Sequence, residues 1–561
     1  MKFKNDPSNP KPIKTLAPGM RRRDFLNGLL VGASGLVLGG LGAGCSDEPG
    51  TGTPPPAGPQ YKGDVFTICH ELRDGKAFEL PAASGDAYDC VIIGGGISGL
   101  VAARKLLKSG VTNILLLEKE DPVGGVSKKG GDPDRTHGQA AAYTVFPYND
   151  NLYETYEDLG IITGYDMDGG AIVDEKYIVK GPANGDWFDG TFYEDGWEEG
   201  MDALPYPPNV IEDLKEFRQD MIDWYSYEGQ DQKFGFDTPT DNSTTDPEVR
   251  GLDNLTLAEY VAGKGWAPEV SEFFDPYVRS ALGTTHDKVS AWAAIGFLCS
   301  EFGPVLSQPG GNAYLALMLA EKVGADKIKT GAFVLRAKNE ADEVHISYMI
   351  DGAITTIRAK TAIYAANRYI AKHVLPDLGA AGRDEAKDYR YTPYIVAAVH
   401  VNKTPPNLGF DNWVHGEFMF TDFIVADWTS HADPAAAPLD RPNVLSCYCP
   451  LFGPTARVDL QTKPFEEYEE RILADLEKVV PGVRATVTGV DLYRWGHAML
   501  SADKGFVFGA ARLSAKMPLG KISFACHDSD GLPAFENAVG AAYTAVYEVA
   551  AHLGVMIDAA P

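Results

Sequence analysis

The sequence has few basic residues for its length and no long hydrophobic run. Lys and Arg total 50 against 78 Asp and Glu, which gives a formal net charge of −28. Because phosphate is repelled by such an acidic chain, the composition argues against nucleic acid as a partner and favours cationic ligands or a high-salt habitat. No stretch of about 18 strongly apolar residues occurs, so the sequence predicts no membrane-spanning helix in the mature chain.

Cysteine is also scarce. The seven cysteines occupy positions 45, 69, 90, 299, 447, 449 and 526. None forms a C-x-x-C motif, which excludes a zinc ribbon and a c-type haem attachment site. Cys90 and Cys526 lie in apolar, strand-like runs and are predicted to be small buried residues.

The first 61 residues are predicted to be an export signal and a linker. Residues 1–44 contain Arg21-Arg22-Arg23-Asp24-Phe25-Leu26 before a glycine-rich apolar run, which is typical of a twin-arginine signal peptide. Cys45 follows a sequence that resembles a lipoprotein cleavage site, and whether it carries a lipid tether to a membrane stays open. Residues 45–61 are rich in Pro, Gly, Ser and Thr, as in a flexible linker. We therefore expect a periplasmic or cell-envelope protein.

A dinucleotide-binding motif follows the linker. The apolar run Tyr88–Ile93 leads into Gly94-Gly95-Gly96-Ile97-Ser98-Gly99, a helical pattern, and a second apolar run that ends in Glu118. In such βαβ units, the first glycine permits a tight turn, the second lets the pyrophosphate approach, and the third lets helix and strand pack. The acidic residue binds ribose hydroxyls. Gly94, Gly96, Ile97, Ser98, Gly99 and Glu118 are the predicted contacts.

The residues after Glu118 distinguish FAD from NAD. Glu118-Lys119 and the downstream Gly124-Gly125-Val126-Ser127 resemble the extension of glutathione-reductase-type flavoproteins, the amine oxidases in particular. The resemblance implies that Lys119, Gly124, Gly125 and Ser127 contact FAD, that Val334 packs on adenine, and that Asp528 binds the ribitol chain. It also implies that the last helix directs its N-terminus at the flavin N1–C2=O edge.

Within the flavin-containing amine oxidases, the resemblance is greatest to bacterial spermidine dehydrogenase-like proteins. It rests on segments such as Cys69–Gly75, Pro309–Asn312 and Tyr493–His497. It implies an α/β fold in which a glutathione-reductase-type Rossmann domain binds FAD and a discontinuous α+β domain binds substrate. We expect FAD-binding segments at 62–150, 306–380 and 486–561, and substrate-domain segments at 151–305 and 381–485.

The same resemblance implies hydride transfer from the C–N bond of an amine or polyamine to flavin. Trp495, with Tyr493 and His497 near it, is the candidate aromatic wall. Core packing is an equal alternative for Trp495 and Tyr493, and a structural, hydrogen-bonded histidine is at least an equal alternative for His497. The acids of 194–223 form either a funnel for a cation or a solvated face.

Other points stay open. Some similar proteins carry haem, which His70 could serve. The strand 394–402 lacks the lysine that monoamine-oxidase-type enzymes place near flavin N5, so the electron acceptor, oxygen or a redox partner, is undetermined. Oxidation of C–C bonds, or a non-catalytic flavin electron-relay lipoprotein, are the alternative functions.

Overall fold

The computed structural model describes residues 61–557 except 86, 132–134, 168, 181–183, 382–387 and 427–440. The expected signal peptide, Cys45 and the linker up to residue 60 lie outside the described residues. Within them, no helix is both long enough and apolar enough to cross a membrane.

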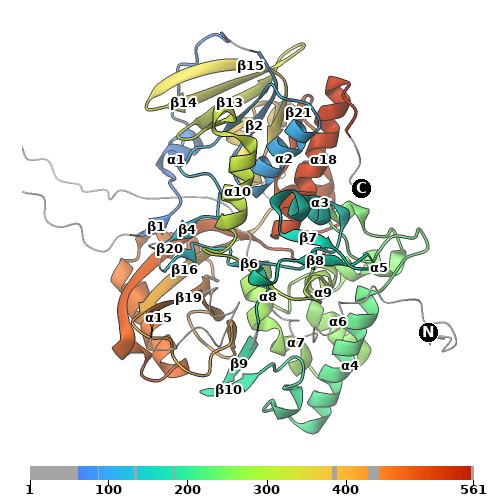
Figure 1. Ribbon diagram of the computed structural model, residues 1–561, viewed down its shortest axis with the longest axis vertical. Coiled ribbons are helices and arrows are strands. Elements are labelled where there is room, and N and C mark those ends of the chain that lie inside the picture. The colour runs from blue at the N-terminus through green and yellow to red at the C-terminus, as the bar shows by residue number, and fades with distance from the viewer. Residues whose placement is uncertain are drawn as a thin grey trace, which may run out of the picture.

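The first of two large sheets forms the upper part of the molecule in Figure 1. Its parallel strands are β2 (Ala87–Ile93), β3 (Ile114–Leu117), β12 (Ile328–Lys329) and β21 (Ile522–Phe524), beside the end of β15 (Ala353–Tyr364). The start of β15 continues into an antiparallel meander with β14 (Val344–Ile350) and β13 (Phe333–Asn339). Helices α2 (Ile97–Lys108), α10 (Ala313–Val323) and α18 (Phe535–Leu553) pack together beside it. The predicted βαβ unit is therefore confirmed.

The second sheet has eight strands in the order β1-β20-β16-β19-β18-β17-β9-β10. The strands are β1 (Lys62–Gly63), β20 (Val487–Leu500), β16 (Tyr391–Val401), β19 (Asn443–Pro450), β18 (Asp422–Val425), β17 (Asp411–Val414), β9 (Asn184–Phe188) and β10 (Thr191–Glu194). Helix α15 (Phe465–Val479) covers one face with a stripe of side chains at helical spacing, all of them buried: Phe465, Tyr468, Ile472, Leu476 and Val479.

The second sheet changes two of the expected segment boundaries. We assigned residues from 486 onward, and residues 62–63, to the FAD-binding part, yet β20 and β1 pair within the second sheet. The cause is long-range pairing: β20 lies antiparallel to β16 along most of its length, a partnership that no local pattern displays.

A helical region covers the other face of the second sheet, at the lower right of Figure 1. It contains α4 (Pro208–Tyr225), α6 (Leu257–Lys264), α7 (Glu269–Phe273), α8 (Asp275–Leu282) and α9 (Ala291–Ser300). The sequence has a helical hydrophobic pattern at 209–226, where α4 forms. A similar pattern at 256–281 forms three helices instead of one, because Gly265 ends α6 with φ +84° and Pro268 and Pro276 begin the next helices.

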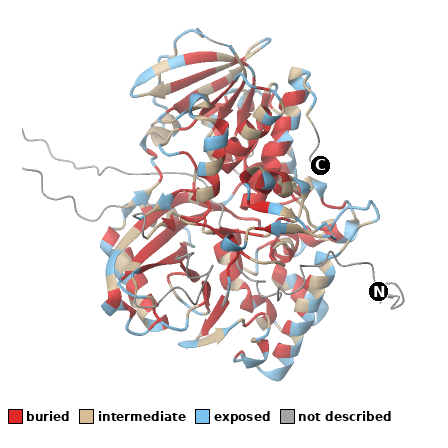
Figure 2. Cartoon of the chain, viewed as in Figure 1, coloured by how far each residue is buried: buried red, intermediate tan, exposed pale blue. Residues whose placement is uncertain are grey.

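The shorter elements connect these layers. They are α1 (Thr67–Arg73), β4 (Lys129–Gly130), β5 (His137–Gly138), β6 (Tyr143–Thr144), α3 (Asp150–Leu159), β7 (Ile162–Tyr165), β8 (Ala171–Val173), α5 (Pro247–Gly251), β11 (Leu306–Ser307), α11 (Arg368–Val374), α12 (Asp377–Ala380), α14 (Ala456–Thr462), α16 (Ala510–Ala515) and α17 (His527–Asp530). Figure 2 shows the buried residues running without interruption through both sheets and the helices between them. Cys90 and Cys526 are buried, as predicted, and each described cysteine is a free thiol.

Candidate functional site

A cavity lies where the parallel strands of the first sheet end. Parallel strands present their carboxyl ends at one edge, where α/β proteins bind ligands. The cavity encloses about 1020 Å³, solvent at its mouth included. Its lining comes from distant stretches of chain: Cys69, Gly94, Gly96–Ser98, Leu117–Lys119, Gly124–Ser127, Ala332–Val334, Tyr364–Asn367, Tyr369, Cys526, His527 and Ala538 are among the residues.

The β2–α2 turn requires glycine because a side chain would overlap neighbouring backbone atoms. Gly94 has φ +111°, and a Cβ there would lie 2.5 Å from the carbonyl oxygen of Ala365. A Cβ on Gly99 would lie 1.9 Å from the carbonyl oxygen of Gly94. Gly96 precedes α2 without a capping side chain, so the first N–H groups of the helix keep their capacity for an anion.

Glu118 is held in position by the backbone. Its Oε2 accepts a hydrogen bond from the Gly95 N–H at 2.6 Å, and its Oε1 accepts one from the Glu120 N–H at 2.9 Å. The carboxyl group is buried at the cavity wall, as ribose recognition requires. Lys119 lines the cavity too, but its ammonium pairs with Asp64 and Glu120, so any cofactor contact is made by its backbone or stem.

The Gly124–Ser127 turn lies against the first motif. The Gly124 N–H donates to the Gly95 carbonyl oxygen at 2.8 Å. Gly124 and Gly125 have φ +130° and +63°, and a Cβ on Gly125 would approach Gly96 Cα to 3.2 Å. Ser127 lines the cavity, and its buried hydroxyl has no hydrogen-bond partner in the protein. A buried orphan hydroxyl at a cavity wall indicates a partner that the ligand supplies.

Val334 lines the cavity as predicted, whereas Asp528 lies behind the wall. Asp528 is fully buried on α17, and its Oδ2 accepts hydrogen bonds from the Arg368 N–H at 3.0 Å and the Tyr391 hydroxyl at 2.7 Å. Its neighbours Cys526 and His527 form the wall instead. Direct ribitol binding by Asp528 therefore stays a prediction, and the observed contacts give it a role in holding Arg368 and Tyr391.

The three candidate catalytic residues occupy every second position of β20, so their side chains lie on one face of the strand. The Tyr493 hydroxyl hydrogen-bonds His137 Nε2 at 3.0 Å, and Trp495 Nε1 donates to the Gln139 carbonyl oxygen at 3.2 Å. His497 stacks on Tyr369 with ring centroids 3.9 Å apart, and burial lowers its pKa to about 3. Only His497 touches a residue of the cavity wall, through Tyr369.

Two other candidates from the sequence, the haem ligand His70 and the acids of 194–223, lie as follows in the structure. His70, the candidate haem ligand, lies on α1 with its ring 4.7 Å from that of Phe66, and haem binding stays a prediction. Several acids of 194–223 already have basic partners in the protein: Glu198 pairs with Arg218, Asp202 with Lys215 and Asp220 with Lys264. These contacts favour the solvated face over the funnel.

Sequence reasoning missed one whole side of the cavity. Ala365, Ala366, Asn367 and Tyr369 follow directly after β15. The sequence does contain a sufficient signal, because the apolar run 361–365 is typical of a buried parallel strand, and such a strand ends at the same edge of the sheet as the run before Gly94. No comparable pattern in the sequence places Cys69 of α1 at the cavity wall.

The described residues fit FAD. The glycine turns admit a pyrophosphate, Glu118 suits a ribose, and Ser127 offers an unused hydroxyl. Helix α18 begins after Ala534 without a side-chain cap, which leaves its N–H groups available to the flavin N1–C2=O edge.

Comparison with known proteins agrees with this geometry. The flavin containing amine oxidoreductase family model matches residues 97–549. Oxidoreductase PigB of Serratia sp. (strain ATCC 39006) is 22% identical over 546 residues, which cover 85% of this chain and 78% of PigB.

Two solved structures share the fold. A putrescine oxidase double mutant superposes with a TM-score of 0.61 at 18% identity, covering 82% of this chain and 99% of that one. Cyclohexylamine oxidase from Brevibacterium oxydans IH-35A gives 0.60 at 18% identity, covering 84% and 100%. The amine-oxidase-like fold is thus confirmed. With the match over residues 97–549, the chain belongs to the flavin-containing amine oxidoreductase family and takes FAD as its cofactor.

Proposed function

We propose that this FAD-dependent oxidoreductase oxidises a C–N bond of a cationic amine after export from the cytoplasm. The α-carbon of the amine gives up a hydride, its nitrogen loses a proton, and the C–N single bond becomes an imine. Water then hydrolyses the imine to a carbonyl compound and an amine. Bound FAD supplies the two-electron acceptor for this reaction.

The observation that carries the amine assignment is the chemistry of the second sheet on the face opposite α15. That face presents buried carboxyl and aromatic groups, Asp411, Asp422 and Trp413 among them. A substrate oxidised at a C–C bond needs an apolar surface, whereas buried carboxyl groups favour a cation. The resemblance to spermidine dehydrogenase-like proteins supports the same assignment.

The protein's own groups have defined tasks in this proposal. The uncapped start of α18 stabilises negative charge that develops at the adjacent edge of the cofactor. We assign the orientation of the amine to Trp495 and Tyr493, which lie outside the lining of the FAD cavity and belong to the same buried cluster as Trp413. His497, with its pKa lowered to about 3 by burial, stays uncharged at neutral pH and so does not repel the cation.

The export proposal rests on the twin-arginine motif of residues 21–26. It places the enzyme in the periplasm or cell envelope, with Cys45 as the candidate lipid attachment site. Release of the mature protein from washed envelopes by Cys45→Ser would support the tether, and an unchanged distribution would contradict it.

The test of the function is an anaerobic absorption spectrum of the purified mature enzyme, before and after addition of a panel of amines. We expect the oxidised flavin band to bleach with at least one amine. An alkene or fatty acid panel is the matched control for C–C oxidation. Bleaching by that panel alone would contradict the amine assignment, and bleaching only by a reduced protein partner would favour an electron relay.

A further inference from the structure

His527 is a basic residue in the wall of the FAD cavity. In the described part of that wall, the other basic residue is Lys119, whose ammonium already pairs with Asp64 and Glu120. His527 lies just beyond strand β21, directly after Cys526, and is 6% exposed. Its imidazole is therefore the remaining group of the wall that is able to offer a positive charge to a ligand.

A buried carboxylate keeps this imidazole charged. His527 Nε2 lies 3.0 Å from Asp528 Oδ1, and the Asp528 side chain is fully buried. Burial by itself opposes a charge on the imidazole, but the Cys526 and Asp528 groups beside it raise the pKa of His527 to about 10. Because burial raises the pKa of the Cys526 thiol, that thiol is neutral at ordinary pH and the carboxylate is the effective partner. Burial opposes ionisation of Asp528 too, yet the charged imidazole lowers its pKa, so the two groups ionise together.

The imidazolium keeps an N–H group for another acceptor. Its Nε2 is close to Asp528 but without hydrogen-bond geometry, so this buried nitrogen has no hydrogen-bond partner among the described residues. Its Nδ1 lies 4.0 Å from Cys526 Sγ, which is a weak acceptor. Buried donors nearly always have a partner, and a charged donor is the most costly to leave without one. For a residue in a cavity wall, we expect the ligand to supply that partner.

A metal ion does not explain the arrangement. Among the described residues, Cys526, His527 and Asp528 are the one group that brings three possible ligand atoms within 4.8 Å of one another. The imidazole, however, faces Cys526 with Nδ1 and Asp528 with Nε2, and these nitrogens point away from the ring in different directions. A single ion at ordinary bond lengths cannot use both contacts, whereas an anion in the cavity suits the positive charge of the ring.

The order of the strands places His527 along the path of the cofactor. At the edge where the parallel strands end, β3 lies beside β2, β2 beside β15, and β15 beside β21. Glu118, the Gly94–Gly96 turn and His527 therefore follow one another along this edge. Neighbouring strands are about 4.8 Å apart, so β2 and β21 are roughly 10 Å apart. An FAD with its adenosine ribose at Glu118 and its diphosphate at the glycine turn extends from there toward His527.

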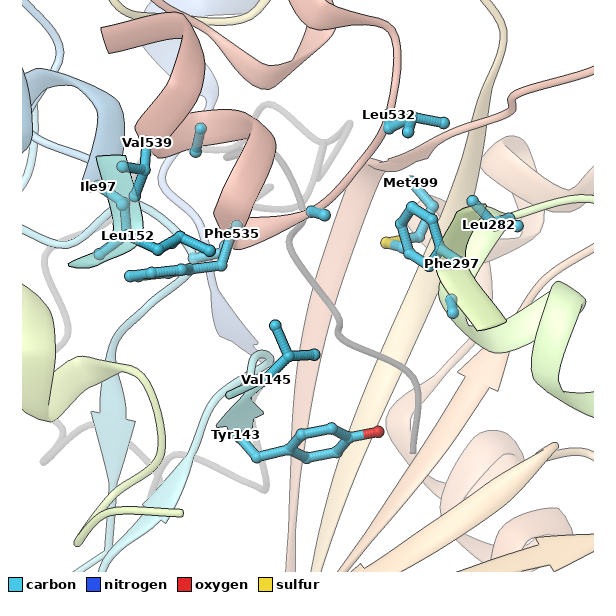
Figure 3. Close-up of a cluster of buried hydrophobic side chains, with 14 of the residues drawn as sticks. Ile97, Tyr143, Val145, Leu152, Leu282, Phe297, Met499, Leu532, Phe535 and Val539 are labelled. Carbon is cyan, nitrogen blue, oxygen red and sulfur yellow. The ribbon is translucent and has the colours of Figure 1, made fainter. Parts of the chain in front are cut away.

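The helices hold the same parts of the wall together. Figure 3 shows Val539 of α18 beside Ile97, the first residue of α2. Helix α18 packs along α2 and also contacts α17, the helical turn that His527 begins. Ile97 and His527 both line the cavity. The start of α2, whose N–H groups suit a phosphate, and the imidazolium thus belong to one packed unit around the same ligand.

We propose that His527, held as an imidazolium by Asp528, binds the flavin-side phosphate of FAD. The glycine turn and the start of α2 bind the adenosine-side phosphate through backbone N–H groups, and His527 supplies the charged donor for the other phosphate. His527 is a cofactor-binding residue in this proposal and takes no part in hydride transfer. The proposal concerns the cofactor alone, so it holds for any substrate.

The test measures cofactor binding and the phosphate spectrum in His527→Gln. Flavin-depleted enzyme is titrated with FAD and with riboflavin, which has no phosphate, and phosphorus NMR records the diphosphate of the FAD-loaded enzyme. His552→Gln is the matched control, because His552 is an exposed histidine on α18. Circular dichroism checks the fold of each variant, and metal analysis checks each preparation for a bound ion.

We expect His527→Gln to weaken FAD binding about 10- to 100-fold, as for the loss of a charged hydrogen-bond partner. Riboflavin binding should change by less than about 3-fold, because riboflavin carries no anion for the imidazolium to bind. At least one phosphorus resonance of bound FAD should shift in His527→Gln. His552→Gln should change neither affinity nor spectrum.

Equal losses of FAD and riboflavin affinity, or unshifted phosphorus resonances, would overturn the proposal. A metal ion that the wild type binds and His527→Gln loses would overturn it too. If His527→Gln does not fold, the decisive measurement is competition of ADP and AMP with FAD for the flavin-depleted wild type. ADP carries a phosphate at the flavin-side position and AMP lacks it, so ADP should bind at least about 10-fold more tightly. Equal affinities of ADP and AMP would contradict a phosphate contact at His527.

Discussion

At the scale of single residues, Glu536 shows how burial changes chemistry. It lies in the first turn of α18 and is 4% exposed, and burial raises its pKa to about 8 from an ordinary 4.5. The folded protein therefore holds a proton that the unfolded chain releases. The stability gained from this proton is complete below pH 4.5 and is lost as the pH rises through 8.

Glu536→Gln should remove the part of the stability loss at rising pH that comes from this carboxyl group. We expect the Tm of the variant to match the wild type near pH 4.5 and to exceed it increasingly toward pH 8. Calorimetry across this pH range measures the difference, and Glu199→Gln, at an exposed glutamate, is the control. Parallel curves for the wild type and Glu536→Gln would contradict the burial argument.

The same scale shows what the sequence could predict of the site. Gly94, Gly96, Gly99, Glu118 and Gly124 were identifiable because a pyrophosphate imposes their spacing within about thirty residues. Asp411 and Asp186 were not, since each is an ordinary aspartate in a polar neighbourhood of the sequence. Their burial and common face depend on strand register across more than two hundred residues.

At the scale of elements, the two faces of the second sheet have separate tasks. Helix α15 covers one face with aliphatic and aromatic residues, and Asp411, Asp422 and Trp413 lie on the other. Leu476 of α15 is fully buried. Leu476→Ala should lower the free energy of unfolding by about 2–5 kcal/mol, because it leaves a cavity in the apolar layer.

The change should leave the rate of flavin reduction by an amine unaltered, because the sheet separates α15 from Asp411, Asp422 and Trp413. Denaturation curves and the flavin reduction assay measure the two effects on one preparation. Arg471→Ala, on the exposed side of the same helix, is the matched control. Slower flavin reduction in Leu476→Ala would contradict this prediction and would mean that the sheet transmits the disturbance.

Element prediction succeeded where the pattern was local. The stripe of α15 and the run of β2 were legible from hydrophobic spacing. The sequence pattern of 355–358 and 361–365 is that of two separate strands, yet the structure has one twelve-residue strand, β15, whose two halves pair with different partners. The assignment of β20 to the wrong domain has the same origin, since pairing partners lie far away in sequence.

At the scale of the whole molecule, FAD connects segments that the chain keeps far apart. A ligand that binds only the folded state stabilises it by RT ln(1 + [L]/Kd), about 2.7 kcal/mol at 100 times Kd. We therefore expect the Tm of flavin-depleted protein to rise with the logarithm of added FAD. Riboflavin, which lacks the pyrophosphate and adenosine that the Gly94–Glu118 region suits, should raise it far less. An equal rise with riboflavin would contradict the assignment of that region.

The residues of the cavity wall are far apart in the sequence, so they are synthesised at different times. Cys69 is the first residue of the cavity wall that a ribosome makes, and Ala538 is the last. At 5–20 residues per second, roughly 20 to 90 s separate them. A nascent chain can hold only part of the cavity during that interval, so loading of the cofactor must await the end of translation.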